Sequence, residues 1–188
     1  MKNNHQGLVE EYEITPQTLI VMPFEYGIKI YSRIIELEDD FISPFRPLDT
    51  IKKSCEYFGS SYDGRKQGTK QLIGITHKAP IAIDPTNSIF FFPTTSAMRP
   101  QCVWISHEHV KFFKRLDSRR TLVRFRNNIE TELEISSSSF ENQLHRTAYL
   151  KSKLNSRIEE TRRRALYSDK EIDSVQASEH AARYRPGM

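Results

Sequence analysis

The sequence is poor in cysteine, tryptophan and glycine, and it contains no long apolar run. Its two cysteines, Cys55 and Cys102, lie in different contexts and are interpreted as reduced, buried thiols. No stretch approaches the roughly 18 apolar residues that a membrane-spanning helix needs. The N-terminus also lacks the apolar run of a signal peptide. We therefore expect a cytoplasmic protein that makes no membrane contact.

Three of the seven glycines lie together in the segment GSSYDGRKQGTK, residues 59–70. Glycine lets the backbone approach a surface closely, and the neighbouring Arg65 and Lys66 indicate a polyanionic partner. A phosphate-binding loop is excluded, because that motif needs lysine and then a hydroxyl residue after its second glycine. Here Gly64 is followed by arginine and lysine instead.

Positive charge is concentrated in the middle of the chain. The whole sequence has a net charge of +4, but residues 61–126 alone contain 12 basic and 4 acidic side chains. Residues 1–60 are acidic, with 6 basic and 10 acidic side chains, and residues 127–188 are balanced. A cationic block of this kind attracts nucleic acid or another anionic surface.

Hydrophobic periodicity predicts an α+β fold in one domain over residues 8–160. Apolar residues at steps of three and four predict a short helix at about 48–58, ended by Gly59, and a long helix at about 139–164. Ser138 and Glu141 form a predicted capping box for the long helix. Residues 1–7 are expected to be disordered, and residues 161–188 to form the helix end and a mobile tail. β-branched and alternating patterns predict a strand-rich core over 19–24, 28–34, 72–76, 81–83, 89–92, 103–105, 110–113, 121–126 and 129–135.

The last two of these strands predict a hairpin whose register affects the charge argument. A three-residue loop at 127–129 places Val123 opposite Leu133, with Arg124 facing Glu132 and Arg126 facing Glu130. These arginines are then neutralised across the strands, so we discount them as ligand contacts. With the stretch 116–126 set aside, residues 61–115 still carry eight basic and three acidic side chains.

Three side chains with chemical potential lie near the end of the cationic block. Cys102, His107 and His109 suggest a thiol- or metal-dependent hydrolase as an alternative function. Their spacing matches no common zinc pattern, and a cysteine–histidine pair has no evident third partner. We expect no metal, no cofactor and no catalysis. The two imidazoles are interpreted as lining an anion-facing surface or as a satisfied strand edge.

Several long segments resemble the ComK family of competence transcription factors. They are GSSYDGRKQGT, THKAPIAIDPTNSIFFFPT, RPQCVWISHEHVKFF and SSFENQLHRTA, and the similarity covers roughly residues 10–155 in the same order. The resemblance implies a bacterial DNA-binding activator of DNA-uptake genes that contacts AT-rich boxes largely through the minor groove. It also implies dimers paired into a tetramer, and control by an adaptor that delivers the protein to a Clp-type protease. Residues 165–167 loosely resemble the segment that such an adaptor binds, and the sequence after them diverges.

The cationic block and the resemblance together predict double-stranded DNA as the partner. We assign phosphate or groove contacts to Arg65, Lys66 and Lys70, with Arg99 as the side chain that enters the minor groove. Peripheral phosphate contacts are assigned to Lys78 and Lys111, and further DNA contacts to His107 and His109. A protein-interaction module is the remaining alternative, in which the acidic first third contacts RNA polymerase or another subunit.

Overall fold

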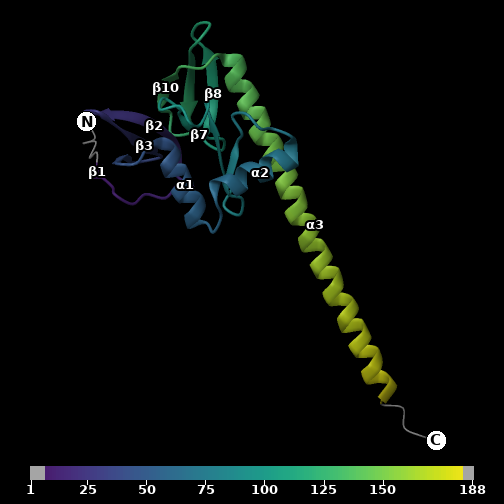
Figure 1. Cartoon of the computed structure of the whole chain (residues 1–188). Coiled ribbons are helices and arrows are strands. Elements are labelled where there is room, and N and C mark those ends of the chain that lie inside the picture. Colours follow the sequence, from purple (N-terminus) through teal and green to yellow (C-terminus); the bar gives the residue numbers. More distant parts are fainter. Residues whose placement is uncertain (1–6, 184–188) are drawn as a thin grey trace, which may run out of the picture. The chain divides into compact units, whose positions relative to one another are not determined.

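The computed structural model describes residues 7–183, with side chains described through residue 166, so most of the expected disordered N-terminus lies outside it. Contacts divide the chain into two units, residues 1–152 and residues 153–188. Two sheets form the strand-rich core of the first unit, which confirms the α+β class (Figure 1). Sheet A has the order β1-β4-β3-β2-β7-β6-β5 and sheet B the order β10-β9-β8. The sheet A strands are β1 (Gly7–Leu8), β2 (Thr18–Tyr26), β3 (Lys29–Glu36), β4 (Asp40–Ser43), β5 (Ile81–Asp84), β6 (Ile89–Pro93) and β7 (Trp104–Ser106).

Consecutive residues of the central sheet A strands face two different cores. In β3, Ile34 packs into one cluster and Ile35 into the other, and in β6 the same holds for Phe91 and Phe92. All four side chains are buried. Successive side chains of a strand point to opposite faces of a sheet, so sheet A is covered on both sides.

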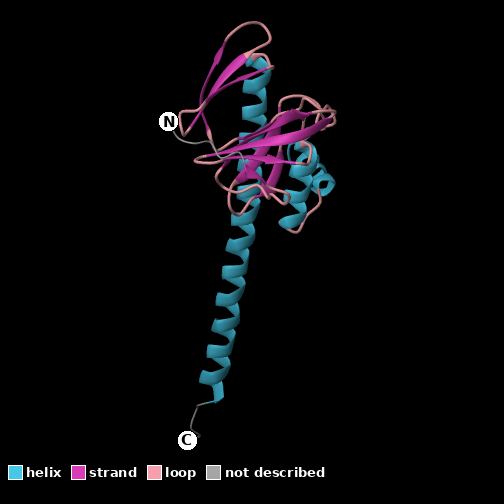
Figure 2. Ribbon diagram, turned by 90° about the vertical axis from the view of Figure 1, so that its left-hand side faces the viewer, coloured by secondary structure: helices cyan, strands magenta, loops and turns pink. Residues whose placement is uncertain are grey.

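Two short helices cover one face of sheet A, as Figure 2 shows. Helix α1 (Pro47–Tyr57) begins with proline in its first turn and buries Ile51 and Cys55 against the sheet. It ends as the sequence predicts, at Gly59, whose φ of 70° suits the left-handed region that favours glycine. Helix α2 (Tyr62–Ile73) packs beside it and stacks the edge of Tyr62 on Trp104.

Sheet B and the first turns of a long helix cover the other face. Sheet B consists of β8 (Val110–Arg115), β9 (Thr121–Phe125) and β10 (Glu130–Leu133), and the long helix is α3 (Ser137–Arg183). Phe140 of α3 is fully buried and contacts both Phe92 of sheet A and Phe113 of sheet B. One aromatic side chain thus joins the two sheets and the helix.

Helix α2 is the main element that the sequence analysis missed. The glycine-rich segment is helical from Tyr62 onward, and the strand predicted at 72–76 is instead the end of this helix and the turn after it. Ser61 caps the N-terminus by accepting a hydrogen bond from the Gly64 N–H at 3.0 Å. Gly74, with φ of 74°, ends the helix. Tertiary packing and the two caps therefore outweigh the low helix propensity of internal glycines.

The register of the last hairpin differs from the prediction by two residues. Arg124 lies opposite Glu130, and Val123 opposite Thr131. The loop is three residues long but occupies 126–128, with Asn128 at φ 66° and a bond of 2.9 Å from the Phe125 N–H to the Ile129 carbonyl. A shift of two residues leaves the apolar face unchanged, so the pattern alone does not distinguish these registers. Arg124 is paired across the strands, but with Glu130 at 2.5 Å rather than with the predicted Glu132, and Arg126 does not face Glu130.

The predicted long C-terminal helix is confirmed as α3, which starts two residues earlier and ends later than predicted. Ser136 caps it, because its hydroxyl accepts a hydrogen bond from the Ser139 N–H at 3.3 Å, and the predicted capping box at Ser138 is not formed. The helix continues to Arg183 rather than ending near residue 164. No helix in the described part of the chain is long and apolar enough to cross a membrane.

Candidate nucleic-acid interface

Helix α2 presents two predicted DNA-contacting lysines to solvent. Lys66 and Lys70 are four residues apart, so they lie on the same face of the helix, and both are exposed. With Asp63, Gln67 and Thr76 they line a shallow open hollow. Asp63 brings one negative charge to this surface, which is otherwise cationic.

Arg65 does not share that surface. Adjacent helical residues point in directions about 100° apart, so the side chain next to Lys66 turns toward the protein. Arg65 is half-buried, and its Nε is buried without a hydrogen-bond partner in the described part of the chain. Its positive charge also acts on the buried thiol of Cys55. The predicted pair of adjacent cations is therefore divided between the surface and the interior.

Arg99 is exposed in the connection between β6 and β7, as the sequence predicts for a loop arginine. It lines a hollow that also contains Glu132 and Glu134 of the β10 region. Two carboxylates beside the guanidinium oppose the approach of a phosphate backbone. The structure thus places the predicted groove residue in a mixed electrostatic environment.

Lys78 and Lys111 are exposed, but on different elements. Lys78 follows α2 at φ 49°, and its carbonyl accepts a hydrogen bond of 3.0 Å from the Gln143 side chain of α3. Lys111 lies on β8 and donates to the Asn128 side chain at 3.1 Å. The Lys78 backbone is thus anchored to α3, and both lysine side chains lie at the surface.

The two histidines contribute no exposed cation. His109 is only 7% exposed, and its Nε2 lies 2.7 Å from the carbonyl of Pro16 inside the protein. Partial burial lowers the pKa of His107, although Glu108 lies 3.5 Å from its Nδ1 and opposes the shift. The lowered pKa favours the neutral form of His107. His109 is buried, so neither imidazole provides a strong cationic contact at the surface.

The hydrolase alternative finds no support at Cys102. This thiol is 1% exposed, and burial raises its pKa to about 11, so the nucleophilic thiolate is absent at neutral pH. Its Sγ lies 3.7 Å from the carbonyl of Thr95. Among the described residues, no group of three or more histidine, cysteine or acidic side chains is arranged to hold a metal ion.

The β8–β9 hairpin carries a cationic cluster outside the predicted site. Residues 110–120 contain five basic side chains and one acidic side chain. Strand β8 forms an edge of sheet B, and Lys114, Arg115 and Arg119 are all exposed. Part of this hairpin belongs to the stretch 116–126, which the sequence analysis set aside from the cationic block because Arg124 and Arg126 were expected to be paired. The sequence DSRR indicates this turn, because an aspartate side chain commonly hydrogen-bonds the backbone N–H groups that follow it in a turn. The two arginines after it make the tip cationic.

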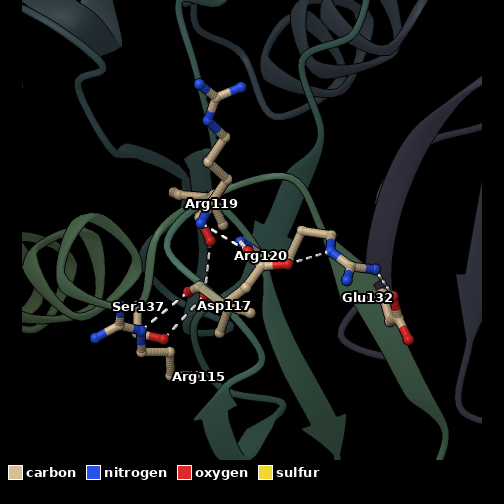
Figure 3. Close-up of polar contacts among 8 residues, drawn as sticks. Arg115, Asp117, Arg119, Arg120, Glu132 and Ser137 are labelled. Atoms are coloured by element: carbon tan, nitrogen blue, oxygen red, sulfur yellow. Dashed lines mark hydrogen bonds and ion pairs between the residues drawn. The ribbon is translucent and has the colours of Figure 1, made fainter.

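Asp117 organises the tip of this hairpin, as Figure 3 shows. Its carboxylate accepts hydrogen bonds of 2.7 Å from the backbone N–H groups of Arg119 and Arg120 and another of 2.7 Å from the Arg120 side chain. These bonds lower the pKa of Asp117 to about 2. Arg120 also pairs with Glu132 at 3.0 Å, whereas the guanidinium of Arg119 points away from Asp117 (Figure 3).

Exposed cations lie on a helix face and on an edge hairpin. Such a distribution of positive charge is typical of a protein that binds an extended anion rather than a small substrate. The chain belongs to the ComK family, because the family model described as "ComK protein" matches residues 9–159. It is 50% identical over 159 residues to the "Competence transcription factor" of Bacillus subtilis (strain 168), with 85% of this chain and 83% of that protein covered. No solved structure matches the chain.

Proposed function

We propose that this protein is a DNA-binding transcription activator of competence genes. The observation that supports this function most directly is the 50% identity to a protein named as a competence transcription factor, over most of both chains. The exposed cations of α2 and of the β8–β9 hairpin provide the charge that binding to a phosphate backbone requires.

The α2 face is the proposed phosphate contact. Lys66 and Lys70 are exposed and share one helix face. The acidic residue nearest to them in the sequence is Asp63, in the first turn of the helix. Lys78 and Lys111 supply further phosphate contacts at the periphery. The side chain of Arg65 is half-buried and does not reach far into solvent. We therefore assign it no direct phosphate contact, but its charge adds to the positive potential of this surface.

The proposed readout is of AT-rich boxes through the minor groove. The exposed arginines Arg99 and Arg119 lie on loops between strands. A loop arginine suits a narrow A·T-rich minor groove, whose negative potential is enhanced. Sequence is then distinguished chiefly through groove width and deformability rather than by hydrogen bonds to base edges.

A salt titration of DNA affinity tests the phosphate contact at α2. Changing Lys66→Ala together with Lys70→Ala should weaken binding to every duplex and flatten the slope of log Kobs against log salt by about two units, one for each lost contact. Fluorescence anisotropy with the full chain at several salt concentrations measures both quantities.

The matched control is Lys29→Ala with Arg46→Ala, which removes the same charge from two exposed positions in the acidic first third. Affinity and slope of the control should stay near those of the wild type. A wild-type protein without measurable DNA affinity at low salt would refute the function. Equal effects of the two double variants would show that only net charge matters and would remove α2 from the interface.

The proposed assembly and regulator follow from the family resemblance, and the proposed polymerase contact follows from the acidic first third. We propose that the protein assembles as a dimer or tetramer on DNA, which light scattering of the complex measures. An adaptor of a Clp-type protease is the proposed regulator. RNA polymerase is the proposed partner of the acidic first third. The cytoplasm, where DNA and polymerase are found, is the proposed location.

A further inference from the structure

We propose that the β8–β9 hairpin is a second DNA-contacting element, and that Arg119 at its tip enters the minor groove. This inference rests on the proposed DNA-binding function and names a residue for its groove contact. It replaces Arg99, whose hollow contains Glu132 and Glu134, as the principal groove residue. The hollow beside Arg119 contains Glu134 and Asp117, but the Asp117 carboxylate is occupied by its hydrogen bonds within the turn.

The tip is preorganised by the protein itself. Asp117 fixes the backbone of Arg119 and Arg120 through two hydrogen bonds, and Arg115 donates from Nε to the Asp117 carbonyl at 3.1 Å. The Leu116 N–H also bonds across the tip to the Arg120 carbonyl at 3.0 Å. A side chain on such a fixed turn loses less conformational entropy on binding than one on a flexible loop.

Pairing within the hairpin distinguishes Arg119 from its neighbours. Arg120 is neutralised by Asp117 and Glu132, and Arg124 by Glu130. The side chain of Arg119 forms no hydrogen bond or ion pair with the residues that the structure describes, and it is exposed. Its guanidinium can therefore bind a ligand without first losing an ion pair.

The two edges of sheet B differ in charge, which favours one side for the approach of DNA. The β8 edge exposes Lys111 and Lys114, whereas the exposed Glu130 and Glu132 of the β10 edge are paired with Arg124 and Arg120. A duplex is therefore attracted more strongly to the β8 edge. When phosphates lie along the β8 edge, the hairpin tip is the part that can reach past the backbone. The minor groove, about 6 Å wide, admits a single arginine side chain more readily than a two-stranded ribbon.

The test measures the affinity of the full chain for two labelled duplexes of equal length, one with a central A·T tract and one rich in G·C. Arg119→Ala should lower affinity for the A·T duplex about tenfold and change the G·C affinity much less. Arg119→Lys should recover only part of the loss, because the strongly hydrated ammonium suits a narrow groove less well than guanidinium. Arg46→Ala is the matched control at an exposed position, and circular dichroism checks the fold of each variant.

Netropsin, a small cation that fills the minor groove of A·T tracts, provides a second readout. It should compete with the wild type and abolish the difference between wild type and Arg119→Ala. Equal losses on both duplexes would identify a phosphate contact and overturn groove entry, and no loss on either would overturn the role of the hairpin tip. Failure of the wild type to bind either duplex would instead refute the DNA-binding function, so the two failures can be distinguished.

Discussion

Arg65 and Lys66 are adjacent in the chain, but helix α2 gives their side chains different surroundings. Lys66 is exposed beside Lys70, and Arg65 is half-buried with an Nε that has no hydrogen-bond partner among the described residues. The same principle applies at the hairpin tip, where Arg120 is occupied by two carboxylates and the Arg119 side chain has no partner in the part of the chain that the structure describes. The charge available to a partner is therefore decided by the direction of each side chain rather than by the number of basic residues.

The thiols of Cys55 and Cys102 should be inert in the folded protein. Both are buried, and burial raises the pKa of each to about 11. We expect a thiol-specific reagent at pH 8 to label both cysteines slowly in the native protein and rapidly in denaturant. The unfolded chain releases these protons near the ordinary pKa of 9.0, so the free energy of unfolding should fall as pH rises from about 9 toward 11. Rapid labelling of native Cys102 would revive a nucleophilic role.

At the scale of elements, α1 shows what could be predicted from the sequence and α2 shows what could not. The helix at 48–58 was predictable because its apolar spacing is regular and Gly59 ends it. Helix α2 lacks a strong apolar stripe, since only Tyr62 and Thr69 are buried, and its glycines resemble a loop. Its stability comes from tertiary contacts such as the bond of 2.8 Å from the Thr69 hydroxyl to the Pro80 carbonyl, which no local pattern reveals.

The site was predictable as a region but not as a set of residues. The cationic block at 61–126 contains both α2 and the β8–β9 hairpin. The sequence could not show that Arg120 takes Glu132 as a partner, because this contact depends on the register of β9 and β10. It also gave no sign that His109 is turned inward onto Pro16, a contact between distant parts of the chain.

Two glycines of α2 should respond to alanine in opposite directions. Gly68 is helical, and an added Cβ would meet no atom within 4 Å, so Gly68→Ala should stabilise the protein by about 0.4–1 kcal/mol. Gly74 has φ of 74°, and Gly74→Ala should destabilise it by about 1 kcal/mol. Urea unfolding measures both values. A destabilising Gly68→Ala would contradict the helical assignment of the segment.

At the scale of the whole molecule, Phe140 links the two sheets. It is fully buried between Phe92 and Phe113, at centroid distances of 5.6 and 5.1 Å. Phe140→Ala should lower the free energy of unfolding by about 3–5 kcal/mol. The exposed Met98→Ala serves as the control and should change it by less than about 0.5 kcal/mol. A small effect of Phe140→Ala in urea unfolding would show that sheet B and α3 pack independently of sheet A.

The alternation of sheet A constrains how this chain can change in length. Ile34 and Ile35 serve opposite cores, as do Phe91 and Phe92, so the loss of one codon within β3 or β6 would send every following side chain of that strand to the wrong layer. Substitutions can be absorbed one at a time, but a deletion there acts on two cores at once. We therefore expect insertions and deletions to be tolerated better in the turns between strands, such as 85–88, than within the strands.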